Sequence, residues 1–145
     1  MKIERIKKGE ISSVQKFENQ LGFELPRDYK EFLMENDGTK FKECSFYIKH
    51  IDQSILLDLL YGVTSEAPFN IYETNKEFAD DIPPKSLIIG DDPGGAMILL
   101  ICDGENDGVY FYDHQYFFEQ SSDIGNTYWI ADTFSDFMKM LTEID

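Results

Sequence analysis

The spacing of hydrophobic positions predicts an amphipathic helix near the start of the chain. Val14, Phe17 and Leu21 recur at helical spacing along one face. Residues 12–15 have the S-x-x-Q pattern of a capping box, which places the helix start there. Gly22 follows the last apolar position, where a left-handed glycine commonly ends a helix.

A second helix is predicted from Pro26, because the fixed φ of proline suits a first helical turn. Tyr29, Phe32 and Leu33 follow at helical spacing, and the Asn-Asp-Gly of residues 36–38 ends this helix. We expect both helices to cover one side of a sheet with their apolar faces.

From Phe41 the hydrophobic period changes from helical to alternating. Cys44, Phe46 and Ile48 alternate with more polar neighbours, as in a half-buried strand. Residues 55–63 fit either a buried strand or a short helix, and we interpret them as strand. Residues 72–79 then predict a short helix, which two prolines close.

The second half of the chain predicts a β-meander. Strands are predicted at residues 87–89, 96–102 and 109–112, and turn-forming residues fill the intervals 90–95 and 103–108. The glycines of the first turn are expected to permit a positive φ.

A last helix follows the meander, with Thr133 and Asp136 as its capping box. Its inward face is formed by Phe134, Phe137, Met138 and Leu141. The element order predicts an α+β fold, a mostly antiparallel sheet packed by N-terminal helices and a C-terminal helix, as a single domain over residues 1–145.

Charge is distributed unevenly along this chain of net charge -15. Residues 1–40 sum to zero, so residues 41–145 carry the whole excess. Residues 86–138 contain ten acids and no lysine or arginine. Such a field repels nucleic acid and anionic membranes and favours encounters with cationic proteins, although acidity can also serve solubility alone.

Several observations bear on location and redox state. There is no apolar run long enough to span a membrane, and the basic start lacks the apolar segment of a secretory signal. Cys44 and Cys102 are far apart and flanked by strand-like residues, which favours buried thiols over a disulfide. We therefore expect a cytoplasmic protein without a metal or other cofactor.

Two turn segments superficially resemble ligand-binding loops. Residues 103–108 begin like a calcium loop, but the pattern fails at Glu105 and at His114, where a bidentate glutamate is required, so a hairpin turn is favoured. Residues 90–95 lack the ending of a phosphate loop, and Asp91 and Asp92 would repel phosphate. These two aspartates form either a solvated tip or part of a partner-binding edge.

An aromatic run is the other candidate for function. It comprises Tyr110, Phe111, Tyr112, Tyr116, Phe117 and Phe118. Either all of its strand residues pack in the core, or some tyrosines stand exposed beside acids, as in interface hot spots. Trp129, the only tryptophan, fits core or helix packing better than an anchor role. His114 could be imagined as a general base, but the sequence supplies no nucleophile for it.

Taken together, the motifs resemble those of the SUKH superfamily. The opening of residues 18–33 is similar to the family's E-x-x-L-G-x-x-L-P pattern, and residues 36–38 stand where the family often has N-G-G. The segments 82–83, 89–95, 108–114 and 133–137 continue the resemblance in order. Residues 41–75 show no family pattern.

The resemblance implies a non-enzymatic α+β binding domain, most often an immunity protein that neutralises a cognate bacterial toxin, frequently a nuclease. A regulatory scaffold that binds signalling or cell-wall-synthesis proteins is the alternative, and a small enzyme is a distant third. A nuclease surface is basic, which agrees with the acidity of this chain. We expect partner contacts from the turn carboxylates and from a tyrosine anchor, namely Asp91, Asp92, Glu105, Asp107, Tyr112 and Asp113.

Overall fold

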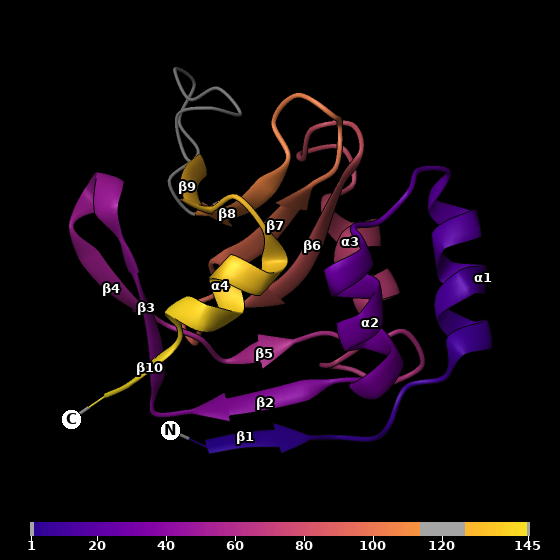
Figure 1. The fold of residues 1–145 in the computed structure, drawn as a ribbon, viewed down its shortest axis with the longest axis horizontal. Helices are drawn as coiled ribbons and strands as arrows, with labels where there is room; N and C mark the ends of the chain where they lie inside the picture. Colours follow the sequence, from indigo (N-terminus) through magenta and orange to yellow (C-terminus); the bar gives the residue numbers. More distant parts are fainter. Residues whose placement is uncertain (1, 114–126, 145) are drawn as a thin grey trace.

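The structure is a computed structural model that describes residues 2–113 and 127–144. Its main sheet has the strand order β1-β2-β5-β6-β7-β8-β9, and all neighbouring pairs are antiparallel (Figure 1). The strands span Lys2–Arg5 (β1), Thr39–Lys42 (β2), Leu59–Leu60 (β5), Ser86–Asp91 (β6), Met97–Ile101 (β7), Gly108–Tyr112 (β8) and Thr127–Ala131 (β9).

A second, three-stranded sheet has the order β10-β3-β4. Its strands span Thr142–Glu143 (β10), Cys44–Ile48 (β3) and Gln53–Leu56 (β4), and the 3-10 turn η1 covers Lys49–Ile51. The helices span Ile11–Leu21 (α1), Arg27–Glu35 (α2), Ile71–Phe78 (α3) and Phe134–Met140 (α4). The predicted α+β class is confirmed, with an antiparallel sheet covered by both N-terminal helices and the C-terminal one.

Strand β8 shows that both faces of the main sheet are covered. Phe111 lies 6.5 Å from Phe46 of β3 between ring centroids, and Phe46 lies 5.3 Å from Phe137 of α4. Tyr112 points to the other face, because neighbouring residues in a strand alternate, and its hydroxyl reaches the carbonyl of Asp81 after α3. Strand β7 is therefore buried along its whole length, as its continuous apolar run predicts.

Helix α3 completes the hydrogen bonding of β6 where the strand ladder stops. Strand β5 pairs only with Gly90 and Asp91, so the earlier part of β6 lacks a strand neighbour on that side. The side chain of Asn75 donates to the Ile88 carbonyl and accepts from the Ile88 N–H, both at 2.8 Å. One amide side chain thus satisfies two buried backbone groups.

The helix boundaries confirm some predicted caps and correct others. Gly22 has a φ of 79° and ends α1 as predicted, and Thr133 accepts a hydrogen bond from the Asp136 N–H at 3.0 Å. The capping box at residues 12–15 is wrong, because α1 begins at Ile11 after Glu10, which makes no side-chain cap.

The strand prediction for residues 55–63 is confirmed only in part. Parts of this segment lie in β4 and β5, and residues 57–58 separate the two strands. Strands β1, β2, β9 and β10 were not predicted from the pattern. They are short, and β1 and β10 are exposed along their whole length, so their residues lack the alternation that marks a half-buried strand.

Residues 36–38 do more than end α2. Asp37 is buried, and its carboxylate accepts hydrogen bonds from the backbone N–H of Thr64 at 3.1 Å and of Ser65 at 3.0 Å, as well as from both hydroxyls. A Cβ at Gly62 would lie only 2.1 Å from Asp37 Oδ1. This glycine is therefore required by the close approach of the two segments.

Candidate functional site

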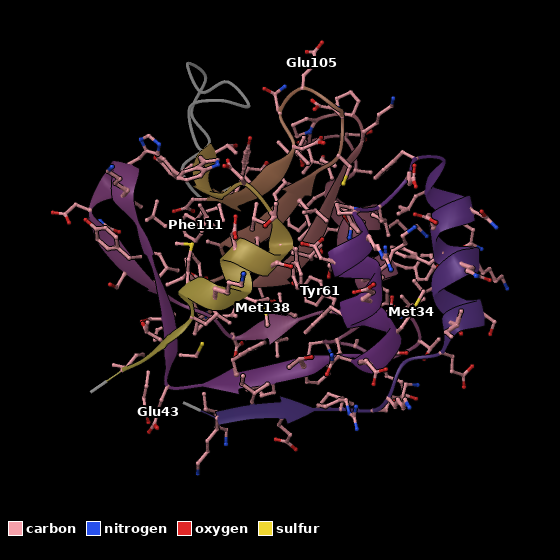
Figure 2. The ribbon with its side chains drawn as sticks, viewed as in Figure 1. Met34, Glu43, Tyr61, Glu105, Phe111 and Met138 are labelled. Atoms are coloured by element: carbon pink, nitrogen blue, oxygen red, sulfur yellow. The ribbon has the colours of Figure 1, made fainter. Side chains whose placement is uncertain are left out.

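The two acidic turns lie at opposite ends of β7. In a meander, consecutive hairpin turns fall at opposite ends of the strand they share. The β6–β7 turn covers residues 92–96 and the β7–β8 turn covers residues 102–107. The five residues of β7 separate the turns by roughly 17 Å. Figure 2 shows Glu105 at the outer tip of the β7–β8 turn.

The six predicted contact residues therefore do not form one surface. We call the first end of the sheet the Asp92 end; it holds the four residues Asp91, Asp92, Tyr112 and Asp113. We call the second the Glu105 end; it holds Glu105 and Asp107. The two groups differ in exposure and in their internal partners.

At the Asp92 end, Asp91 is engaged inside the protein. Its Oδ2 accepts a hydrogen bond from the Tyr61 hydroxyl at 2.7 Å, and its Oδ1 is buried with no hydrogen-bond partner among the described residues. The pKa of Asp91 is raised to about 6, mainly by burial; the Tyr61 hydrogen bond and Lys40 lower it, and the charges of Asp58 and Asp92 raise it. Lys40 itself forms an ion pair with Asp58.

Asp92 closes its own turn. Its Oδ1 accepts from the Ala96 N–H at 2.8 Å, and its backbone N–H donates to the Ala96 carbonyl at 2.9 Å. Burial raises the pKa of Asp92, and the charge of Asp113 contributes in the same direction. The prediction for the turn glycines holds at Gly95, with a φ of 94°. Gly90 lies in β6 instead, where a Cβ would approach the Leu59 carbonyl oxygen to 2.3 Å.

Tyr112, which we predicted to anchor a partner, is buried in the structure. The side chain is only 5% exposed, because the segment after α3 covers that face of β8. Phe111 lies in the core, as one of the two interpretations proposed, while Tyr110 is half-buried. Asp113 is half-buried as well. The remaining aromatic residues of the run, and His114, lie outside the described residues.

At the Glu105 end, the turn is held by its own carboxylates. Asp103 Oδ1 accepts from the N–H of Glu105 at 2.9 Å and of Asn106 at 2.6 Å, and Asp107 Oδ1 accepts from the Gly104 N–H at 2.8 Å. Glu105 and Asp107 remain exposed to solvent. The predicted hairpin turn is confirmed. Within residues 2–113 and 127–144, no three His, Cys, Asp or Glu side chains lie close enough together to hold a metal ion.

Trp129 is the functional candidate that the sequence did not reveal. The prediction that it packs in the core or on a helix is wrong, since its side chain is 39% exposed. It lies on β9 directly opposite Tyr110 of β8. Its Nε1 donates to Asp132 Oδ1 at 3.2 Å, and its ring lies nearly perpendicular to the His50 ring, with 6.3 Å between the ring centroids.

A hollow of about 400 Å³ lies beside this tryptophan. Trp129 and Tyr110 form its aromatic side, Asp103 and Asn106 of the turn form its polar side, and Pro83, Ile101 and Thr127 complete it. We call it the Trp129 hollow. A missed signal was the alternation in residues 127–131, where Tyr128 and Ile130 face one way and Thr127 and Trp129 the other.

Comparison with known protein families identifies the fold. The model of the family described as SMI1 / KNR4 family (SUKH-1) matches residues 10–140 of the chain. The chain belongs to the SMI1 / KNR4 family. A search of curated proteins finds no match. Members of this family are generally non-catalytic binding domains, and the family is compatible with either an immunity or a regulatory role.

The structure gives a physical reason for the opening motif of this SMI1 / KNR4 chain. Glu18 Oε2 accepts from the Leu25 N–H at 2.7 Å and lies 3.2 Å from Lys30 Nζ, so one carboxylate holds the α1–α2 connection to both helices. Gly22 supplies the left-handed residue between them. Together these contacts fix a loop that reaches the Glu105 end of the sheet.

That loop and the β7–β8 turn line a second, open hollow of about 570 Å³, with Cys102 in its lining. Burial, together with the charges of Asp107 and Asp103, raises the pKa of the Cys102 thiol to about 12. At neutral pH Cys102 is therefore a thiol and not a nucleophilic thiolate. Both cysteines are free, as predicted; Cys44 is buried, whereas Cys102 is only half-buried.

Among the described residues of this family member, no helix combines the length and apolar character needed to cross a bilayer.

Proposed function

We propose that this protein is a non-enzymatic immunity protein that neutralises a cognate, basic, nuclease-type bacterial toxin domain in the cytoplasm of the producing cell. We further propose that it binds the toxin through the Glu105 end of its sheet. The observation that carries this proposal is the exposed Trp129 beside a turn whose outer carboxylates, Glu105 and Asp107, face solvent.

Electrostatics supports the choice of the Glu105 end over the Asp92 end. Glu105 and Asp107 keep their charge at the surface, where it can steer a cationic partner during diffusion. Asp91 instead accepts a hydrogen bond from Tyr61 and Asp92 accepts one from Ala96, and both carboxylates are partly desolvated. Partly buried carboxylates of this kind contribute less to long-range steering.

Aromatic residues support it as well. Interface hot spots are enriched in tryptophan and tyrosine, and Trp129 and Tyr110 are paired on adjacent strands and line one hollow with the β7–β8 turn. A nuclease active site attracts phosphate and so tends to be positively charged. An acidic, aromatic surface is complementary to such a site.

A test of this proposal uses the toxin domain encoded beside this gene. Association is measured by stopped-flow for the wild type and for Glu105→Gln combined with Asp107→Asn. We expect association at low salt to slow roughly three- to tenfold and to lose part of its salt dependence. The matched control combines Glu4→Gln with Glu10→Gln, which removes two exposed carboxylates at the β1 side of the molecule.

The control should change association much less than the turn variant. If the two double variants slowed association equally, the Glu105 end would be excluded as the contact surface, and the change in net charge alone would explain the slower association. Failure of the wild type to bind the neighbouring toxin domain, or to rescue cells that express it, would favour the alternative of a regulatory scaffold.

A further inference from the structure

We propose that the Trp129 hollow receives one arginine side chain of the bound partner. This inference rests on the proposed partner-binding role of the Glu105 end and specifies the chemistry that this end recognises. The hollow has about 400 Å³ of space, which suits a single long side chain and not a helix or a strand.

The charge around the hollow favours a cation. Apart from Tyr110, Asp103 is the only ionisable residue among the described residues that line the hollow. No lysine or arginine lines the hollow within this described part of the chain. Hydrogen bonds from the Asn106 and Glu105 N–H groups and from the Asn106 side chain lower the pKa of Asp103. Asp103 therefore stays ionised at neutral pH.

Further carboxylates act on the same space. The pKa of Tyr110 is raised first by burial, and then by the charges of Asp103, Asp132 and Asp107. The charges of three carboxylates therefore act on one tyrosine of the hollow wall. A cation that enters beside Tyr110 gains attraction from all three, whereas a phosphate group would be repelled.

The aromatic walls are already held in place. The indole Nε1 of Trp129 donates to Asp132, and the Tyr110 hydroxyl donates to the Asn106 carbonyl at 2.7 Å. Side chains fixed in this way lose little further conformational freedom when a ligand binds. The hollow is therefore prepared for its occupant before the partner arrives.

Arginine fits this arrangement better than lysine does. Its planar guanidinium stacks on an indole face and can form two parallel hydrogen bonds to a carboxylate, while an ammonium group is more strongly hydrated and offers neither. The aliphatic stem can pack on Ile101 and Pro83, which lie on the apolar side of the hollow. Trp129 and Asp103 would then hold the guanidinium between them.

The fluorescence of Trp129 tests the inference directly, because it is the only tryptophan in the chain. The full-length protein is titrated with the tripeptide amide Gly-Arg-Gly, and in parallel with the same peptide carrying citrulline, a neutral group of nearly the same shape. We expect the arginine peptide to shift or quench the emission with a dissociation constant in the millimolar range. Citrulline should bind at least about tenfold more weakly, and lysine should fall between them.

Variants localise the effect. Asp103→Asn keeps an oxygen that can accept from the Glu105 and Asn106 N–H groups, but it removes the charge and the acceptor of the Asn106 side chain, so the affinity for the arginine peptide should fall about fivefold or more. Glu4→Gln is the control, since Glu4 is an exposed carboxylate on β1 that does not line the hollow, and its effect should be less than twofold. The comparison of arginine with citrulline on the wild type remains decisive if Asp103→Asn disturbs the turn.

Equal responses to the arginine and citrulline peptides, or no response to either at tens of millimolar, would overturn the inference. An emission that changes on dilution without peptide would identify a second copy of the chain as the occupant and overturn it as well. If the toxin binds through the Glu105 end but the arginine peptide does not change the Trp129 emission, the proposed function is retained and this inference is refuted. An arginine response without toxin binding supports the hollow and refutes the proposed function.

Discussion

The Tyr61 hydroxyl donates a hydrogen bond at 2.7 Å to Asp91 Oδ2, inside a partly buried group of charges that includes Asp58 and Lys40. Burial also raises the pKa of Tyr61 itself, and the bond to Asp91 adds to that effect. The hydrogen bond only partly compensates the loss of hydration of the carboxylate, because the pKa of Asp91 still rises from 3.8 to about 6. This residue therefore opposes folding when it is ionised.

The stability contribution of Asp91 should depend on pH in a defined window. The folded protein retains a proton on Asp91 between pH 3.8 and about 6, whereas the unfolded chain has lost it, so the free energy of unfolding falls as the pH rises through this range. Asp91→Asn should therefore raise the free energy of unfolding at pH 7.5 by on the order of 1 to 2 kcal/mol after allowance for solvent screening, and by clearly less at pH 4. Urea denaturation at both pH values measures the difference.

Glu105→Gln provides the comparison for this experiment, because Glu105 is exposed and should change stability by less than about 0.5 kcal/mol at either pH. The same stabilisation by Asp91→Asn at pH 4 and at pH 7.5 would contradict the assignment of a raised pKa to Asp91.

Asp28 connects the first turn of α2 to the first turn of α4. Its Oδ1 accepts from the Tyr29 N–H and its Oδ2 from the Ser135 N–H, both at 2.8 Å. Asp28→Ala should lower the free energy of unfolding by about 1 to 3 kcal/mol, because two helix N–H groups lose their acceptor. Glu31→Ala, at a largely exposed position of the same helix, should cost less than about 1 kcal/mol. Equal losses in thermal denaturation would show that the link to α4 contributes nothing.

Asn75 should be essential for the integrity of β6. Asn75→Ala leaves the Ile88 N–H and carbonyl without their side-chain partner, which should cost about 2 to 4 kcal/mol. Amide hydrogen exchange at Ile88 should accelerate more than exchange at Leu99, the residue opposite it on β7. Lys76→Ala, exposed on the same helix, is the control and should leave the exchange rate of Ile88 unchanged.

Two glycines should respond differently to alanine. Gly62→Ala would place a Cβ 2.1 Å from Asp37 Oδ1 and 2.3 Å from the Gly38 nitrogen, and we expect a loss of more than about 3 kcal/mol or failure to fold. At Gly22 no atom lies within 4 Å of the Cβ position, so Gly22→Ala should cost only about 1 kcal/mol for its φ of 79°. Chemical denaturation of both variants makes the comparison, and a smaller loss at Gly62 would contradict the close approach of its segment to Asp37.

Local patterns in the sequence predicted those elements whose signals are themselves local. The C-terminal cap at Gly22, the Thr133 cap of α4 and the buried strand β7 each depend on residues within a few positions of one another. The prediction of a capping box at residues 12–15 was wrong because the helix begins at Ile11, before the position that this pattern indicates. Strand β1 is held by pairing with β2, a partner more than thirty positions away in the sequence, and its own residues are exposed on all sides.

The composition of the sequence indicated which residue types form the candidate site, but the sequence did not indicate how these residues are arranged in space. The acids of both turns were apparent from the sequence, but their separation follows from the antiparallel order of β6, β7 and β8. The burial of Tyr112 depends on the chain segment that follows α3, and the exposure of Trp129 depends on which part of the β8–β9 face that segment leaves open. The alternation of residues 127–131 could have assigned Trp129 to one face of β9, but no pattern within β8 or β9 shows which part of that face stays open.

The sequence by itself therefore determined the fold class, the acidic character of the second half and the family to which the chain belongs, because periodicity, charge and motif order are properties of the chain alone. Only the tertiary structure decided which carboxylates remain exposed to solvent and which are partly buried and accept internal hydrogen bonds. It also brought Pro83 of the segment after α3, Asp103 of the β7–β8 turn and Trp129 of β9 around one hollow. The physical reason is that solvation and proximity depend on packing between residues distant in sequence, which local preferences do not specify.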